Sequence, residues 1–337
     1  MPGRRSPFRG AGLGLGLALG SAWVASASPE AGAPTLDELR SATVSGLEEP
    51  KSPVTLEAGR WEGEPVTPGG ASRAGVWLVR GFRSTGDLDG DGADEAVVLI
   101  GSSGGGSGSL THVVAFGRRD GRPVQLAAAL LGDRVQVRAA RIEDRLLRIY
   151  LVQAGEGDAA CCPGEVTIRG YRLAPAQEGD GARLTPEPLC RTPRRLGPET
   201  IGDGEWVLRA WSRDEPAPGT PEVTLQHRLG RLGGSAGCNR YSASVVAGAS
   251  PGDVTIGPAA ATRRACAEPA ASLEQRYLAA LAAVQRIGFL AGQLALTAVA
   301  EDRPTTLLFD ERPGKAGTSL DVLFCQEPAT DDAPPAR

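Results

Sequence analysis

The chain has 337 residues, more than one ordinary hydrophobic core organises, and this length suits two domains. Its formal net charge is −4, and setting aside the first 27 residues, with three arginines and no acid, leaves 33 basic against 40 acidic residues. This acidic balance, without basic runs, argues against nucleic-acid binding. No stretch after residue 27 is long and apolar enough to cross a membrane.

Residues 1–27 have the three parts of a secretory signal peptide. Three arginines lie within the first nine residues, an apolar segment follows over residues 11–24, and Ala25-Ser26-Ala27 forms a small-residue cleavage site. No cysteine lies near the cut, so a lipid anchor would have no attachment residue. We expect an exported protein, periplasmic or secreted, whose mature chain begins at Ser28.

Residues 28–35 are expected to be flexible, and residues 36–175 to form a first β domain. It contains the loop 86–95, which has the spacing of a calcium-binding loop. Val98 stands where a helix-loop-helix calcium hand has its last glutamate, so the loop belongs between strands. The sequence predicts a calcium site, with a solvated acidic turn as the alternative. The expected ligands are Asp87, Asp89, Asp91, the carbonyl of Ala93, and Glu95, with Gly92 at the turn.

Period-2 alternation between turn residues predicts antiparallel strands throughout this first half, without any amphipathic helix. The predicted strands span 76–79, 96–100, 110–116, 126–131, 135–137, 146–152 and 166–171. The acidic loop, the Ser/Gly stretch 101–108, Gly132-Asp-Arg134 and Cys161-Cys-Pro163 precede a closing strand with Tyr171. In this order they resemble an uncharacterised β domain of exported bacterial proteins.

Six cysteines in an exported chain are expected to form disulfides, and they allow fifteen full pairings. Adjacent cysteines rarely meet ordinary disulfide geometry. For Cys161 and Cys162 we therefore favour one bond elsewhere, for example to Cys190, with the other thiol buried. A redox-active bond between the two neighbours is the alternative. Zinc is not expected, because the chain has no C-x-x-C pair.

Residues 176–199 are rich in Pro, Gly and charge and predict a linker. A second domain is expected over 200–328, with a disordered tail at 329–337. Its predicted strands span 206–211, 223–228, 241–246, 254–256, 294–299, 306–309 and 320–324. A helix is predicted over about 272–287. Ser272 and Gln275 would form its capping box, and its apolar stripe is Leu273, Tyr277, Leu281 and Val284.

Several motifs of the second domain keep one order along the chain. They include Trp206, Gly237-Cys238-Asn239-Arg240-Tyr241, Thr262, Cys266, Glu274 and Tyr277. Over about residues 200–312 this order resembles the META domain family (HslJ-like proteins). The resemblance implies a small, mainly antiparallel, barrel-like fold with one packed helix. It also implies a bacterial envelope location, a tie to stress or antibiotic tolerance, and no catalytic residues.

We therefore expect a mainly β (α+β) protein with two small antiparallel, barrel-like domains and no organic cofactor. A Cys238–Cys266 disulfide is predicted, because both cysteines flank the strands that frame the motif. The favoured function is a non-enzymatic envelope protein that binds a partner the sequence does not identify. The alternatives are a β-barrel binder of a small apolar ligand and a hydrolase. The hydrolase would use His112 or His227, although neither lies in a nucleophile motif.

Overall fold

The computed structural model describes residues 32–159, 161–175, 181–190, 192–300, 303–312 and 320–325. The predicted signal peptide and C-terminal tail lie outside the described residues. The described chain is mainly β with few helices, as the sequence predicts. No helix among these residues reaches the length and apolar character that a membrane span requires.

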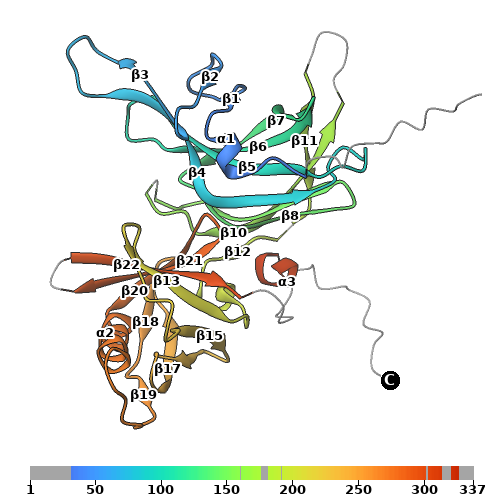
Figure 1. Ribbon diagram of the computed structural model, residues 1–337. Coiled ribbons are helices and arrows are strands. Elements are labelled where there is room, and N and C mark those ends of the chain that lie inside the picture. Colours follow the sequence, from blue (N-terminus) through green and yellow to red (C-terminus); the bar gives the residue numbers. More distant parts are fainter. Residues whose placement is uncertain are drawn as a thin grey trace, which may run out of the picture. The chain divides into compact units, whose positions relative to one another are not determined.

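The N-terminal unit contains two antiparallel sheets (Figure 1). In the first, the strands lie in chain order: β3 (Arg60–Pro65), β4 (Arg73–Gly86), β5 (Glu95–Ser103), β6 (Leu110–Arg119) and β7 (Arg122–Asp133). The second has the order β11 (Arg183–Pro188), β10 (Glu165–Ala174), β9 (Leu146–Gln153) and β8 (Gln136–Glu143), and β12 (Arg194–Arg195) pairs with β10.

The central strand β5 is buried on both faces, which explains its uninterrupted apolar run. Val97 and Leu99 pack against the second sheet, in a core that includes Leu147 and Ile149. The opposite face of β5 is covered by α1 (Leu36–Leu39), β1 (Thr43–Val44) and β2 (Val54–Thr55), which bury Leu39 against it.

The C-terminal unit is one curved antiparallel sheet. Its strands follow the order β18 (Val254–Ile256), β17 (Arg240–Ala247), β16 (Arg231–Ser235), β15 (Thr224–Arg228), β13 (Trp206–Ser212), β22 (Arg303–Glu311), β21 (Gln293–Ala300) and β20 (Val284–Leu290). Two short strands, β14 (Glu215–Pro216) and β19 (Ala260–Ala261), pair with β13 and β17. The N–H of Ile287 donates to the carbonyl of Gly252 at 2.8 Å, which brings β20 beside β18 and nearly closes a barrel.

The packed helix α2 (Ala270–Ala282) is shorter than predicted. Leu273, Tyr277 and Leu281 form the expected buried stripe. The predicted capping box is wrong, because the helix starts after Pro269 and Ser272 bonds the Glu268 carboxylate. The last apolar residue of the predicted stripe, Val284, opens β20.

Two further predictions differ from the structure. Residues 320–324 form the helix α3 (Leu320–Phe324), because their buried positions Leu320, Leu323 and Phe324 follow helical spacing. The expected linker carries β11, β12 and the 3₁₀ turn η1 (Pro198–Ile201). Only Leu184 of β11 is buried. Because the other residues of β11 are polar or proline, the composition of this segment does not indicate a strand.

The N-terminal and C-terminal units share a hydrophobic core, and contacts group the chain from Gly32 onward as one compact unit. Tyr150 and Ile168, on β9 and β10, belong to the core of the C-terminal unit. Phe324 of α3 meets the ring of Tyr150 edge-on, with centroids 5.9 Å apart. The residues on these two strands that face away from the N-terminal core are thus covered by the C-terminal unit.

A disulfide joins the two chain segments that flank the C-terminal unit. Cys190, after β11, pairs with Cys325, after α3, with 5.5 Å between their Cα atoms. The sequence interpretation that offered Cys190 as a partner for Cys161 is therefore wrong. The bond closes a loop that contains the entire C-terminal unit, since the two cysteines are 135 residues apart.

Replacing both Cys190 and Cys325 with serine should lower the free energy of unfolding by up to about 5 kcal/mol, from the entropy of an unlinked loop of this length. Urea denaturation of the full-length chain in non-reducing buffer measures the change. An unchanged midpoint would show that this bond does not constrain the unfolded chain.

Candidate functional site

The acidic loop connects β4 to β5, as the sequence predicts. One carboxylate oxygen from each of Asp87, Asp89 and Glu95 lies within 4.8 Å of the other two. Asp91, another predicted ligand, is not a member of this group, and the carbonyl of Ala93 as a ligand stays a prediction. The described residues thus bring together three oxygen donors of the kind that calcium prefers.

Backbone N–H groups hold the aspartates in place. Asp87 accepts from Gly90 at 2.6 Å and from Gly92 at 3.2 Å. Asp89 accepts from Asp91 at 3.0 Å, and Asp91 accepts from Ala93 at 2.8 Å. These are the local side-chain-to-backbone bonds that acidic residues form in turns, so the loop keeps its shape through its own aspartates.

Glu95 is the buried member of the group, with 3% of its surface exposed. Its carboxylate accepts from the N–H groups of Leu88 at 2.7 Å and Asp89 at 3.3 Å. Burial raises the pKa of Glu95 to about 7, and the charges of Asp89 and Asp91 add to this increase. A cation at this point would offset the cost of burying the Glu95 charge beside Asp89 and Asp91.

The Arg145 side chain lies against the loop at Gly90. A Cβ atom on Gly90 would meet the Arg145 side chain at 2.7 Å, and Gly90 has a φ of +89°. A larger residue at Gly90 would therefore be strained by the backbone conformation and would have to displace the flexible end of the Arg145 side chain.

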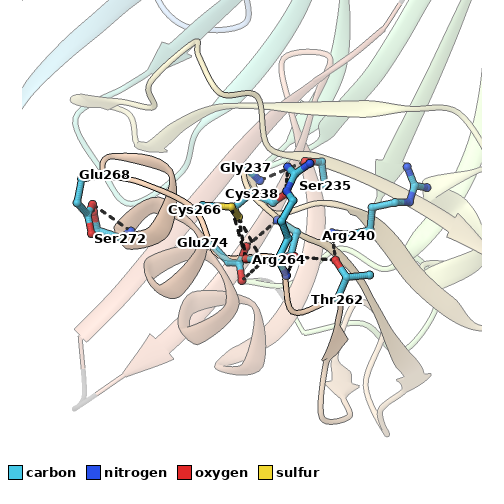
Figure 2. The surroundings of a disulfide bond; sticks show 11 residues. Ser235, Gly237, Cys238, Arg240, Thr262, Arg264, Cys266, Glu268, Ser272 and Glu274 are labelled. Carbon is cyan, nitrogen blue, oxygen red and sulfur yellow. Dashed lines mark hydrogen bonds between the residues drawn. A yellow bond between two sulfur atoms is a disulfide. The ribbon is translucent and has the colours of Figure 1, made fainter.

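The second predicted cluster lies around the Cys238–Cys266 disulfide in the C-terminal unit (Figure 2). The Asn239 side-chain oxygen accepts from the Thr262 hydroxyl at 2.7 Å and from the N–H of Arg264 at 2.8 Å. Its amide nitrogen donates to the Arg264 carbonyl and to Glu274 of α2, and its backbone N–H donates to Glu274 at 2.7 Å. This saturated, buried amide joins the loop before β17, the loop after β19 and the helix.

The flanking residues of the motif support the same junction. Cys238 and Cys266 form a disulfide with Cα atoms 6.2 Å apart, the pairing that the sequence predicts. Gly237 has a φ of +101° and packs under Leu273, where a side chain would be strained. Arg264, which the sequence analysis did not single out, donates to the Cys238 carbonyl at 2.8 Å.

The aromatic residues of the motif lie in the barrel core. The hydroxyls of Tyr241 and Tyr277 are 2.7 Å apart, and burial raises the pKa of both. Trp206 is fully buried and donates to the carbonyl of Ile201. The guanidinium of Arg138, from β8 of the N-terminal unit, lies 4.3 Å from the centre of the Trp206 ring and bonds Glu311 at 2.8 Å. No sequence pattern indicates this contact, because a lone arginine in a strand resembles a surface residue.

Arg240 has an exposed side chain on β17, and Thr262 is exposed as well. The backbone N–H of Arg240 donates to the Thr262 hydroxyl at 3.2 Å. The buried side chains of the motif are Trp206, Cys238, Asn239, Tyr241 and Tyr277.

The two histidines occupy different environments. His112 is fully buried in β6, where Nε2 accepts the N–H of Glu48 at 3.2 Å and burial lowers the pKa of the imidazole. His227 is half-buried on β15, and burial lowers its pKa as well. His112 is therefore shielded from any substrate in solution.

Cys161 and Cys162 pair with each other, with Cα atoms 3.8 Å apart. The expectation that one of them bonds elsewhere is wrong, because the only other cysteine proposed for it, Cys190, is joined to Cys325. The neighbouring pair lies beside an open pocket of about 320 Å³, which the sequence did not reveal because its walls come from distant segments.

Comparison with known proteins identifies the C-terminal unit. Residues 199–312, about a third of the chain, match the META domain family, which confirms the predicted resemblance to that family, while the likeness to HslJ-like proteins stays a prediction. We call this part the META-like barrel. No curated protein matches the chain.

Two solved structures are similar in sequence over part of the chain. An NMR structure of a protein from Burkholderia xenovorans is 27% identical and covers 39% of this chain and 98% of its own, with a TM-score of 0.28. A second NMR structure is 23% identical and covers 34% and 95%, also with a TM-score of 0.28. At these scores, neither supports a structural argument.

Replacing Asn239 with alanine should lower the free energy of unfolding by about 3 kcal/mol, because it removes a buried amide whose several hydrogen bonds join Thr262, Arg264 and Glu274. Chemical denaturation of the full chain measures the loss. Thr255→Ala, an exposed change on β18, is the control and should stay within about 0.5 kcal/mol of wild type. Equal stability of both variants would contradict a structural role for Asn239.

Proposed function

We propose that this protein is an exported, non-enzymatic component of the bacterial cell envelope that acts by binding and holds calcium in its acidic loop. The convergence of Asp87, Asp89 and Glu95 carries the calcium proposal. Three carboxylates on one short loop repel one another, and burial of Glu95 strengthens that repulsion. A divalent cation is the partner that turns this unfavourable arrangement into a stabilising one.

The non-enzymatic part of the proposal is supported by how the META-like motif uses its side chains. Asn239, Tyr241 and Cys238 are engaged in bonds within the protein. They therefore stabilise the fold and leave no obvious nucleophile or base. The link to envelope stress or antibiotic tolerance is supported only by the META resemblance.

The two alternative functions find less support. The barrel interior is filled by large side chains such as Trp206, Tyr277 and Phe309, so a small apolar ligand would have to displace packed core. A hydrolase that used His112 would need a buried imidazole to reach a substrate. Binding by an outer surface is the function that agrees best with the packed interior of the barrel.

Calcium should raise the melting temperature of the full-length chain relative to chelator. At free calcium 100-fold above Kd, the stabilisation should be about 2.7 kcal/mol, which corresponds to a shift of several degrees. Asp89→Asn keeps an oxygen that can accept from Asp91 and removes the charge, so it should abolish the shift. Asp144→Asn, at an exposed turn of the same unit, should retain it. Identical melting of the wild type in both buffers would leave the loop as an acidic turn.

Export predicts that the secreted protein begins at Ser28. The six cysteines, all paired in the structure, support an oxidising compartment. Mass spectrometry of protein from the medium and the periplasm gives the N-terminus directly. A chain that keeps Met1 and stays in the cytoplasm would overturn this part of the proposal.

A further inference from the structure

The outer wall of the META-like barrel carries a pocket that neither the calcium loop nor the family motif uses. Its floor is the outward face of β20, β21 and β22. Gly288 pairs with Ala295, and Ala295 pairs with Leu308, so these three side-chain positions form one row. In an antiparallel sheet, directly opposed residues share a face, and this row is therefore small and apolar.

A second row on the same face is polar. Arg286 pairs with Thr297, and Thr297 pairs with Thr306. The two threonine hydroxyls lie 3.4 Å apart. The pocket therefore has an apolar row and a hydrogen-bonding row side by side.

The opposite wall comes from elsewhere in the chain. Gln136 of β8 and the Cys161–Cys162 disulfide line it, together with Leu196. Gln136 accepts the N–H of Phe289 at 2.8 Å, which fixes its side chain against β20. The open pocket has a volume of about 320 Å³, at the lower end of the range for small-molecule sites.

The charge of the lining is positive. Arg213 and Arg286 line the pocket, and no Asp or Glu of the described residues does. Arg286 directs Nε toward Asp253 at 3.4 Å, while its Nη1 lies 3.7 Å from the sulfur of Cys162. Arg213 is exposed and has no ion pair or hydrogen bond among the described residues. The site thus offers one uncommitted guanidinium and a second that is only partly neutralised.

We propose that this pocket binds a small organic carboxylate, with the carboxylate on Arg213 and Arg286 and the apolar body along Ala295 and Leu308 of the apolar row, since Gln136 Oε1 covers Gly288. A guanidinium matches a carboxylate with two parallel hydrogen bonds, and the threonine row offers further donors. The apolar row distinguishes such a ligand from inorganic phosphate, which would leave it uncovered. The proposal is independent of calcium binding.

Octanoate is a suitable probe, titrated into the full-length protein in calcium-free buffer by isothermal calorimetry. It should bind with one site per chain. The Arg213→Gln/Arg286→Gln double variant should weaken binding at least tenfold, and Ala295→Leu should do the same by filling the apolar row. Arg228→Gln, an exposed arginine on β15, should leave the affinity unchanged.

Two further ligands test the two parts of the pocket separately. 1-Octanol, which lacks the charge, and inorganic phosphate, which lacks the apolar body, should each bind at least tenfold more weakly than octanoate. Equal binding of octanol would overturn the role of the arginines, and equal binding of phosphate would overturn the role of the apolar row. Absence of octanoate binding at millimolar concentration, or binding unaffected by the pocket variants when their melting temperatures match wild type, would overturn the site.

Discussion

The buried guanidinium of Arg138 is the contact on which the arrangement of the two β units depends. Only 3% of this side chain is exposed, yet it belongs to the N-terminal unit and lies against Trp206 and Phe289 of the META-like barrel. A buried arginine is tolerable only when it is paired, and Glu311 at the end of β22 supplies the charge. Because Trp206 starts β13 and pairs with Glu311, Arg138 closes this end of the barrel. The adjacent core, which includes Tyr150 and Ile168, extends the same interface.

This arrangement separates residues that maintain the fold from residues available for binding. The family motif joins two loops to α2 through Asn239, and its tyrosines fill the barrel. The features that remain open to solvent are the acidic loop of the N-terminal unit and the pocket on the outer barrel wall. Both lie beside rigid strands, which suits binding sites whose geometry must persist without a ligand.

Much of the fold could be predicted from local patterns, because alternation and apolar spacing are local properties. The strand β5, the stripe of Leu273, Tyr277 and Leu281, and the approach of Asp87 to Asp89 all follow from short stretches of sequence. The contacts of Arg138, the pairing of Cys190 with Cys325 and the pocket wall at Gln136 join residues more than a hundred positions apart. Single-sequence reasoning has no signal for such contacts. It also misassigned α3, since five residues satisfy helical and strand spacing almost equally well.

The shared core should make the two β units unfold as one. Hydrogen exchange of the full-length chain across a urea series, read by mass spectrometry on peptides from β5 and β21, tests this most directly. Amides in β5 and in β21 should lose protection from exchange at the same urea concentration. Loss of protection in β21 while β5 remains protected, or the reverse, would contradict it.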